Sequence, residues 1–369
     1  MRICILTTTH NPFDVRIFQK EAKTLAKDYK VVVIAPNDKN REFIKSNIQV
    51  ITVKKPKSKI LHFLTLWRVF KTGIRHKYDI VHCHEPDSLI IGLLFKFLRG
   101  SKVIYDVHEH WPSEIVYGWL KIKHKPILKK IVETLSYLVE IKSSKFADCV
   151  IAVSNSVAER FKKNGIDVKI LPNVPLMSKI TSSKKKDCDV VLVGGGLQEY
   201  HGINELLSAL ANVKNHIPTV TLKIVGNVKV NIEEMLSEFK LSSNTILTGY
   251  LNLEKMYSEI QKGKIGVILF KAEFHNAYLG LPNKLFDYML CGLPVVASDF
   301  PEIRRVVSSA KCGILADPNN IKEITDAMLY LFKSPAEAKK MGIRGKRLIE
   351  REMNWERMED ILMDVYRNL

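Results

Sequence analysis

Short runs of β-branched residues alternate with helical patterns along the whole 369-residue chain, and this rhythm restricts the fold more than any other feature. The expected strands of the first half read ICILTT, VVVIAP, IQVITV, DIVHCH, KVIYDVH, CVIAVS and VKILPN. Helical patterns such as FQKEAKTLAK, LIIGLLFKFLR and VAERFKKNG lie between them. Strands that alternate with helices predict a parallel sheet with helices on both of its faces.

A polar stretch, PLMSKITSSKKKDCD, interrupts the alternation of strand and helix patterns, which then resumes. The expected strands of the second half read DVVLVGG, TLKIVG, TILTGY, KIGVILF, LPVVASD and GILAD. The polar stretch is typical of a linker, and a chain of this length can bury two cores. We therefore predict an α/β protein with two doubly wound, Rossmann-like domains at 1–174 and 175–352, followed by an amphipathic helix in 353–369. Ligands of such sheets bind at the carboxyl ends of the strands.

Basic residues outnumber acidic ones, with 57 Lys and Arg against 39 Asp and Glu, which gives a net charge of +18. The sequence has no zinc-finger, helix-turn-helix or aromatic RNA-binding pattern, so nucleic acid is not an expected partner. The run KIKHKPILKK at Lys121–Lys130 mixes lysine with apolar residues and continues into IVETLSYLVEIK. Such a segment is typical of a helix on an anionic membrane surface, and a solvated basic face is the alternative.

The chain begins MRICILTTTH and enters a strand-like run directly, so we expect no signal peptide. No apolar run in the sequence has the length needed to span a bilayer. The six cysteines form no CxxC pair, which favours a reducing compartment. We therefore expect a cytoplasmic protein, peripheral at the inner face of the membrane if the basic segment binds lipid. The sequence leaves the oligomeric state open.

The segment Gly280–Asp299, GLPNKLFDYMLCGLPVVASD, indicates a ligand more clearly than any other. Its first residue lacks a Cβ and permits close approach, and Pro282 suits the first turn of a helix. The expected helix, 283–291, starts with N–H groups and a positive dipole end that favour an anion. Lys284 adds a cation there, and Asp287 lies one turn further along the same face. A phosphate beside a hydroxyl-bearing group fits this pattern, and a nucleotide sugar has both.

The stretch PNKLFDYMLCGLPVVASD resembles the nucleotide-binding segment of the retaining, GT-B-fold glycosyltransferases of family 4. Other segments resemble the same family in the same order and cover nearly the whole chain: THNPFDVRIFQKEAKTLA, DIVHCHEPDSLIIGLL, VIYDVHEHWP, VIAVSNSVAERF, KILPNVP, VGGGLQEYHGINELLSAL and LKIVGN. The resemblance implies two domains that face each other across a cleft. The N-terminal domain would bind the acceptor and the C-terminal domain the donor, and the final helix would pack back on the N-terminal domain.

The same resemblance implies a reaction. A sugar would pass with retention from a UDP- or GDP-linked donor to a hydroxyl of a polysaccharide or lipid-linked glycan, without a metal ion or other cofactor. The implied donor-binding residues are Gly196, His201, Gly280, Leu281, Pro282, Asn283, Lys284 and Asp287.

Asp287 stands where the family usually has a glutamate that binds the ribose hydroxyls, and its two carboxylate oxygens suit two vicinal donors. The family's other acidic residue would fall on Leu279, so the contact that it makes to the donor sugar is not expected here. Gly196 and His201 stand where many relatives carry an arginine and a lysine on the diphosphate. A protonated His201 would serve there, because nearby negative charge raises its pKa; a surface loop position is the alternative.

His108 follows the expected strand VIYDV, where the family has a histidine that hydrogen-bonds the donor sugar, and we predict that it is catalytic. Glu109 is the alternative polar group at that edge. His10, Asp14 and Arg16 match the first-loop pattern of the family and are expected on the acceptor side of the cleft. Arg16 would contact an acceptor phosphate, while Asp14 is also a candidate helix cap.

His82 and His84 flank Cys83, and their spacing places both on one face of a strand. No further cluster of ligands follows them in the sequence, so we expect these residues to line the cleft and predict no metal site.

Two other functions fit the same architecture. A nucleotide-sugar epimerase is one, although the first-loop and PNKLFDY patterns favour a transferase. A non-catalytic nucleotide-sugar binding module is the other, favoured by the incomplete acidic pair at Leu279 and by the missing arginine and lysine.

Overall fold

The computed structural model describes residues 1–122, 124–177 and 185–369, so residues 178–184 of the expected linker lie outside it. Contacts within the chain separate two compact units, one formed by 1–173 with 357–369 and the other by 174–356. Each unit contains one sheet, and together they confirm the α/β class with two doubly wound sheets.

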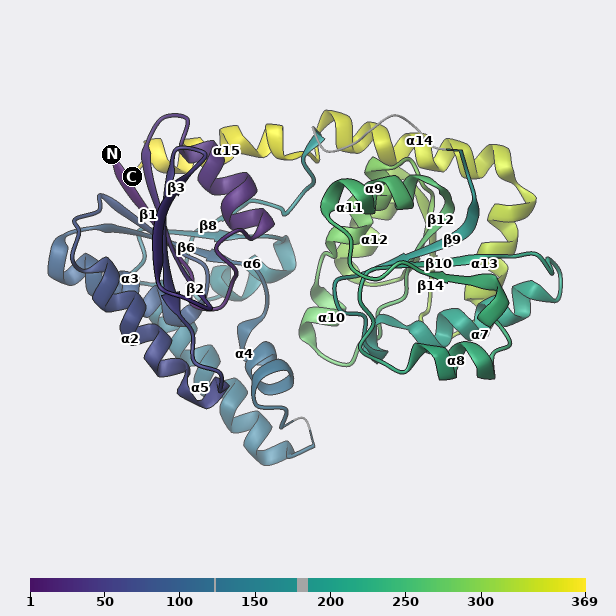
Figure 1. The fold of residues 1–369 in the computed structure, drawn as a ribbon, viewed down its shortest axis with the longest axis horizontal. Coiled ribbons are helices and arrows are strands. Elements are labelled where there is room, and N and C mark those ends of the chain that lie inside the picture. The colour runs from purple at the N-terminus through teal and green to yellow at the C-terminus, as the bar shows by residue number, and fades with distance from the viewer. Residues whose placement is uncertain (123, 178–184) are drawn as a thin grey trace. The chain divides into compact units, whose positions relative to one another are not determined.

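The first unit contains an eight-stranded sheet in the order β3-β4-β2-β1-β5-β6-β7-β8 (Figure 1). Its strands are β1 (Arg2–Leu6), β2 (Lys30–Asn37), β3 (Arg41–Lys45), β4 (Ile48–Lys54), β5 (Ile80–Cys83), β6 (Lys102–Val107), β7 (Cys149–Ala152) and β8 (Val168–Ile170). Its helical segments are η1 (Val15–Ala22), α1 (Lys23–Leu25), η2 (Lys59–Leu61), α2 (His62–Gly73), α3 (Pro86–Arg99), α4 (Trp111–Glu114), η3 (Ile115–Trp119), α5 (Pro126–Ser144), α6 (Asn155–Lys162) and most of α15 (Trp355–Arg367). All paired strands run parallel except β3, which pairs with β4 as an antiparallel hairpin.

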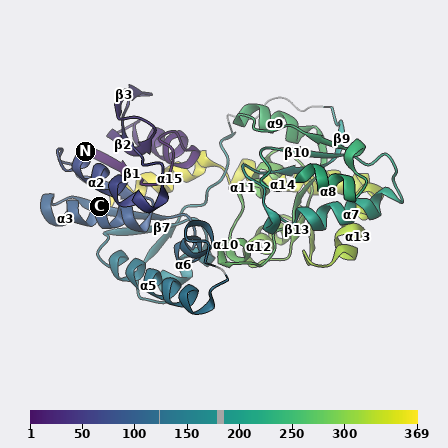
Figure 2. The same cartoon turned by 60° about the horizontal axis from the view of Figure 1, so that its bottom comes forward.

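Alternation along the strands gives this sheet two different faces. Val81 and Cys83 of β5 belong to a core cluster that also contains residues of α2, α3, α5 and α6. Their neighbour His82 points to the other face, where its Nδ1 lies 2.7 Å from the Tyr366 hydroxyl of α15. Helices α2 and α3 lie side by side on the first face (Figures 1 and 2), whereas α15 covers the second.

The second unit has a six-stranded parallel sheet in the order β11-β10-β9-β12-β13-β14. Its strands are β9 (Cys188–Val193), β10 (Leu222–Val225), β11 (Thr245–Leu247), β12 (Gly263–Ile268), β13 (Val295–Ser298) and β14 (Gly313–Ala316). Its helical segments are η5 (Glu199–His201), α7 (Ile203–Lys214), α8 (Ile232–Glu238), η6 (Ser242–Asn244), α9 (Leu253–Gln261), α10 (His275–Leu279), α11 (Asn283–Leu290), α12 (Pro301–Ala310), α13 (Ile321–Lys333) and α14 (Pro335–Arg351).

The strand order reverses between β9 and β12, and in such sheets a ligand binds in the crevice beyond the carboxyl ends at this point. One core of this unit forms where α7 and α13 pack beside each other over the sheet, around Leu206, Leu210, Ile224 and Met328.

All six cysteines are free thiols. Within the described part of the chain, none of the helices combines the length and the apolar character that crossing a bilayer requires.

Candidate functional site

The loop after β1 is held by one buried carboxylate, Glu85, which sequence reasoning did not single out. The Glu85 side chain, 1% exposed, accepts a hydrogen bond from the Thr7 hydroxyl. It also accepts hydrogen bonds from the Thr8 N–H at 3.1 Å and the Thr9 hydroxyl at 2.8 Å. Glu85 precedes α3, and its own N–H donates to the Ser88 hydroxyl at 2.8 Å. The carboxylate thus fixes the first loop to the start of α3.

His10 and Asp14 lie on this loop. Asp14 caps η1 by accepting hydrogen bonds from the N–H groups of Arg16 at 2.8 Å and Ile17 at 3.1 Å, as the capping alternative predicted. The His10 ring is partly exposed, and its centroid lies 5.4 Å from that of His108. The structure therefore brings two of the expected residues, His10 and His108, together.

Arg16 occupies a different place from the one expected. Its side chain is 3% exposed and forms a bidentate pair with Asp106, with Nη2–Oδ2 at 2.8 Å and Nε–Oδ2 at 3.0 Å. A second ion pair joins Nε to Glu21 Oε1 at 2.8 Å, and Nη1 donates to the Leu171 carbonyl at 3.1 Å. The expectation that Arg16 meets an acceptor phosphate is wrong, because the guanidinium is buried and its donors are engaged inside the unit.

Arg16, Asp106 and Glu21 form a buried group of ion pairs. Burial by itself would raise the pKa of Asp106, but Arg16 and then His108 hold it well below its usual range. Burial raises the pKa of Glu21 well above its usual range, although Arg16 opposes this shift. One guanidinium therefore lies between two carboxyl groups whose pKa values shift in opposite directions.

Three histidines complete the cluster, and strand alternation places them on the face that carries η1 and α15. The rings of His82 and His84 stack with their centroids 4.7 Å apart, and both side chains are 0% exposed. Nδ1 of His84 lies 3.0 Å from Nε2 of His108, which in turn lies 3.4 Å from Asp106 Oδ2. His84 was expected to line a cleft, and this is wrong because its ring is buried. Burial lowers its pKa well below the usual range, and the neighbouring His82 and His108 add to this effect.

No further ligands follow His82 and His84 in the sequence, but the fold brings two carboxylates beside them. Among the described residues, Glu21, His82, His84 and Asp106 form one group whose possible ligand atoms all lie within 4.8 Å of one another. Arg16, however, forms ion pairs with both carboxylates. A divalent cation would add a second positive centre beside a buried guanidinium, so the donor set suits the arginine better than a metal.

His108 and Glu109 form the part of this cluster nearest the surface. Burial lowers the pKa of His108 although Asp106 opposes the shift, so the ring is neutral at neutral pH. Burial raises the pKa of Glu109 to about 8, and the nearby Glu114 and Glu85 add to this. The carboxyl edge of the first sheet thus presents a neutral imidazole next to a carboxylic acid that keeps its proton at pH 7.

The second unit assembles a basic site at the carboxyl edge of its sheet. Gly196 follows β9, and a Cβ built on it would lie 3.0 Å from Cε of Lys229. The Lys229 N–H donates to the Leu197 carbonyl at 2.7 Å, which fixes this lysine beside the glycine loop. Lys229 was not among the predicted residues, and only its position after the β10 strand end, in the stretch VGNVK, could have indicated it.

Lys284 is the second cation of this site. Its side chain is 9% exposed, and its ammonium lies 5.0 Å from the centroid of the Phe270 ring. Burial lowers the pKa of Lys284 to about 7, although Asp287 opposes the shift. Among the described residues neither Lys229 nor Lys284 has an ion-pair partner within salt-bridge distance, so this site contains more positive than negative charge.

Burial and then the charges of both lysines lower the pKa of His201. Burial lowers its pKa to about 4, with further contributions from Lys284 and Lys229. Its Nδ1 accepts a hydrogen bond from the Gln198 N–H at 2.9 Å, so the neutral ring carries its proton on Nε2. Without ligand, His201 is therefore a neutral N–H donor, and its protonation beside a diphosphate stays a prediction.

The start of α11 adds backbone donors. Pro282 is its N-cap, and within the described chain no side chain caps this helix, so its first N–H groups remain available to an anion. Gly280 permits a close approach as expected, but the group it accommodates is the Asn276 carbonyl, 2.2 Å from where a Cβ would lie. The missing side chain thus permits packing against α10, and the approach of a ligand to the Gly280 backbone stays a prediction.

Asp287 lies one turn into α11, and its Oδ1 accepts a hydrogen bond from the Tyr257 hydroxyl at 2.9 Å. Tyr257, on α9, is 2% exposed and fixes the orientation of the carboxylate. Leu281 and Asn283 adjoin the same helix start and contribute its backbone. Lys284 and Asp287 therefore lie one turn apart on the same helix, next to its free N–H groups.

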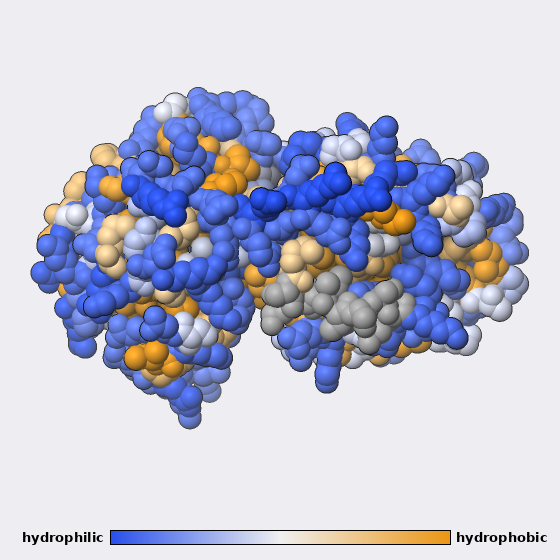
Figure 3. All heavy atoms as spheres, turned by 90° about the horizontal axis from the view of Figure 1, so that it is seen from above, coloured by the Kyte–Doolittle hydropathy of each residue, from blue (hydrophilic) through white to orange (hydrophobic). Residues whose placement is uncertain are grey.

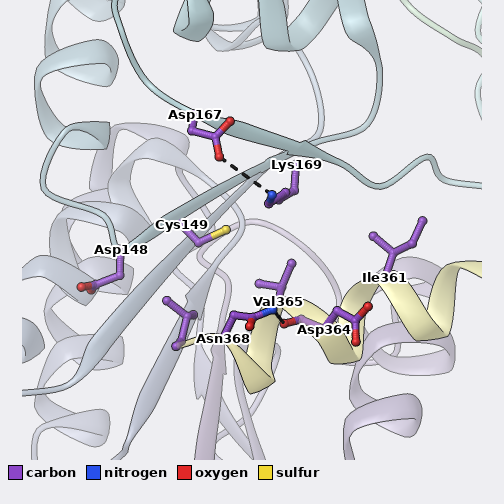
Figure 4. A pocket seen from close by; sticks show the side chains of 9 residues that line it. Asp148, Cys149, Asp167, Lys169, Ile361, Asp364, Val365 and Asn368 are labelled. Atoms are coloured by element: carbon purple, nitrogen blue, oxygen red, sulfur yellow. Dashed lines mark hydrogen bonds and ion pairs between the residues drawn. The ribbon is translucent and has the colours of Figure 1, made fainter.

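A separate pocket of about 510 Å³ lies at the opposite, amino-terminal edge of the first sheet (Figure 4). Cys149 and Lys169, from β7 and β8, line it together with Asp364 and Val365 of α15. Burial raises the pKa of the Cys149 thiol to about 11, so the pocket contains no reactive thiolate at neutral pH. None of the residues that line it is a predicted site residue.

Comparison with known proteins agrees with this arrangement. The chain is 23% identical over 370 residues to an uncharacterised glycosyltransferase of Methanocaldococcus jannaschii, covering 91% of this chain and 89% of that protein. The structure of sucrose-phosphate synthase from Thermosynechococcus elongatus matches with a TM-score of 0.82 at 17% identity, covering 100% of this chain and 98% of the other. Anabaena HepE, solved with UDP-glucose, matches with a TM-score of 0.73 at 17% identity, covering 100% of both chains.

These features define a glycosyltransferase of the GT-B fold that uses a nucleotide sugar. The sequence model described as Glycosyltransferase Family 4 matches residues 15–174, and the model described as Glycosyl transferases group 1 matches residues 178–348. The chain therefore belongs to glycosyltransferase family 4, a retaining family.

Proposed function

We propose that the protein transfers a hexosyl group from a UDP- or GDP-linked sugar to a hydroxyl of a glycan or lipid-linked acceptor, with retention. The observation that carries the proposal is the site at the start of α11, where Lys284 and Lys229 lie near a glycine loop and Asp287 lies one turn further on. The diphosphate would occupy the basic end and the ribose the Asp287 end. The UDP-glucose complex of Anabaena HepE supports a UDP sugar as the first donor to test.

The donor site would stabilise the leaving diphosphate without a metal ion. Negative charge that develops on the leaving oxygen meets Lys284, Lys229 and the N–H groups of α11, which are fixed before the reaction. Lys284 is near half-protonation at neutral pH in the absence of ligand. An arriving diphosphate would raise its pKa, so the lysine would gain its full charge only when the donor is bound.

His108 would position the donor sugar. Its Nε2 lies within 3.4 Å of the ionised Asp106, which favours the proton on that nitrogen. Nδ1 then remains an acceptor for a sugar hydroxyl. Glu109, which keeps its proton at pH 7, would donate a hydrogen bond beside it.

The basic segment Lys121–Lys130 supports an acceptor at an anionic membrane surface, and Lys123 within it lies outside the described residues. The helix α5 that begins in this segment exposes Ile127 and Ile131 among its lysines. A location at the inner face of the membrane follows as part of the proposal.

Thermal-shift measurements with UDP, GDP, UDP-glucose and GDP-mannose would select the donor, because a ligand that binds the folded state raises the melting temperature. The selected sugar nucleotide is then incubated without acceptor. Slow release of nucleoside diphosphate, with water as acceptor, is the expected result. Rapid isomerisation of the sugar while it stays on the nucleotide would identify an epimerase and contradict the proposal. Binding without any turnover, with water or with added glycan and lipid-linked acceptors, would contradict it in favour of a binding module.

A further inference from the structure

Helix α2 exposes two aromatic side chains on the side that faces away from the sheet. Phe63 and Trp67 lie one turn apart, and each is 58% exposed. Thr65 and Val69, on the opposite side of the same helix, are buried against the sheet. A soluble surface rarely exposes neighbouring Phe and Trp without a function.

Helix α3 continues this apolar surface. Leu94, Phe97 and Leu98 are 42%, 67% and 61% exposed, whereas Phe95 is buried in the core. Helix α2 packs against α3, and both contribute to the core cluster on one face of the sheet. Their outward stripes therefore face the same side of the unit, as the adjacent positions of α2 and α3 in Figure 2 indicate.

Helix α5 adds a third stripe. Leu135, Leu138 and Val139 are exposed, whereas Glu140 and Ile141 on its inner side are buried. Helix α5 packs against α3 and shares the same core cluster. We name the outward residues of α2, α3 and α5 the three-helix face.

The segment that contains α2 is strongly basic. The stretch 54–78, KKPKSKILHFLTLWRVFKTGIRHKY, contains eight Lys or Arg residues and no Asp or Glu. Lys71 and Arg75 of this stretch are exposed at and just beyond the end of α2. The face seen in Figure 3, over which α14 and α15 run, is by contrast mainly hydrophilic, with smaller hydrophobic patches.

We propose that the three-helix face docks on an anionic lipid surface. Phe63, Trp67 and Phe97 would enter the boundary between headgroups and acyl chains, while the lysines and arginines would remain among the anionic headgroups. Trp is suited to this position because its ring is apolar and its N–H is polar. The docking surface thus extends well beyond Lys121–Lys130, with α2 as its aromatic anchor.

A second copy of the chain is a poorer occupant. A symmetric dimer through this face would bring each basic stretch 54–78 close to the same stretch of its partner. No acidic residue of that stretch offsets the repulsion. An anionic bilayer, in contrast, complements both the apolar stripes and the charge. The inference does not depend on the donor or on the transfer reaction.

Co-sedimentation with vesicles tests the inference. Wild-type protein should sediment with vesicles that contain phosphatidylglycerol and remain largely in solution with pure phosphatidylcholine. The double variant Phe63→Ser/Trp67→Ser should bind the anionic vesicles at least about tenfold more weakly, because two large apolar side chains no longer leave water. The double variant Lys71→Gln/Arg75→Gln should lose about thirtyfold, since each cation near the surface contributes.

The matched control is Tyr250→Ser/Tyr330→Ser, which removes two exposed rings from the second unit and should bind as the wild type does. Melting temperatures of all variants should equal that of the wild type, because the substituted side chains are exposed. The fluorescence of Trp67 gives a second readout of docking. Its emission spectrum is the difference between the spectra of the wild type and Trp67→Phe, and it should shift to shorter wavelength on anionic vesicles.

Three results would overturn the inference. The first is equal sedimentation of the wild type with neutral and anionic vesicles. The second is unchanged sedimentation of Phe63→Ser/Trp67→Ser. The third is a dimer in vesicle-free solution that this variant disperses, because a second copy would then cover the three-helix face.

Discussion

The two units handle charge in opposite ways. In the first unit the buried guanidinium of Arg16 forms ion pairs with Asp106 and Glu21, so its charge is balanced inside the unit. In the second unit Lys229 and Lys284 lie near a glycine loop with one carboxylate, Asp287, one turn away. A cluster that is already balanced positions its neighbours, whereas a site with excess positive charge is prepared for an anion.

The largest expected effect concerns the balanced cluster. The double variant Glu21→Gln/Asp106→Asn leaves Arg16 buried without a carboxylate and should lower the free energy of unfolding by about 3–5 kcal/mol. Glu21→Gln alone should cost less than the double variant, because Asp106 still pairs with Arg16. Asp106→Asn alone should also cost less than the double variant, since Glu21 still pairs with Arg16. Urea unfolding measures all three.

Asp364→Asn is the control, because Asp364 pairs with Arg367 on the exposed side of α15 and should cost less than about 1 kcal/mol. If the cost of Glu21→Gln/Asp106→Asn equals the sum of the single costs, the two carboxylates do not substitute for each other. The account of the balanced cluster would then be wrong.

His108→Ala tests what the balanced cluster positions. Turnover of the selected sugar nucleotide should fall about a hundredfold or more, because a positioned group at the reaction centre is lost. The affinity for the nucleoside diphosphate should not change, because that group binds in the other unit. His216→Ala, an exposed histidine of the second unit, is the control. Weaker diphosphate binding with normal turnover would place His108 outside the reaction centre.

Asp287→Ala tests the ribose end of the basic site. The affinity for UDP or GDP should fall about tenfold, because hydrogen bonds to a charged acceptor are lost. Tyr257→Phe should have a smaller effect in the same direction, since it removes only the group that orients the carboxylate at 2.9 Å. Isothermal titration measures both, with Asp326→Ala on α13 as the control. Unchanged affinity in Asp287→Ala would reject the ribose assignment.

Glu109→Gln should have the smallest effect, and one that depends on pH. Burial raises the pKa of Glu109 from 4.5 to about 8, so the folded protein binds a proton there that the unfolded chain has already lost. This contribution to stability is therefore largest at low pH and is lost as the pH rises through this interval. The melting temperature of Glu109→Gln relative to the wild type should increase between pH 5 and pH 8. A constant difference would contradict the raised pKa.

Much of the fold could be predicted, because buried parallel strands are apolar along their length. All thirteen predicted strands are present, and the two sheets have the expected doubly wound form. Strand β3 was not predicted, because its sequence, REFIK, is polar and exposed at the edge of the sheet. It forms through an antiparallel hairpin whose turn residues Ser46 and Asn47 have positive φ values of 52° and 60°. A single asparagine in a polar stretch is a weak signal for such a turn.

The site was predicted less completely, because sequence order does not reveal burial. Arg16 and His84 lie in strand-end and loop patterns that usually face a ligand, yet three-dimensional packing encloses both. Glu85 could have been suspected, since a carboxylate followed by proline at a strand end is suited to anchor a neighbouring loop. Lys229 comes from a strand end more than fifty positions before Lys284 in the sequence, and only the sheet order brings them to the same edge.

The central claim is that the basic site of the second unit binds the diphosphate of the donor. Isothermal titration of UDP and GDP at about pH 8, in buffers of different ionisation enthalpy, tests it most directly. Lys284, with a pKa of about 7 in the free protein, should take up a proton as the diphosphate binds. The affinity of the protein for UDP or GDP should therefore fall as the pH rises above 7. Lys284→Met should lose the proton uptake and bind about ten- to a hundredfold more weakly. Binding with no proton uptake, and equally tight in Lys284→Met, would contradict the claim.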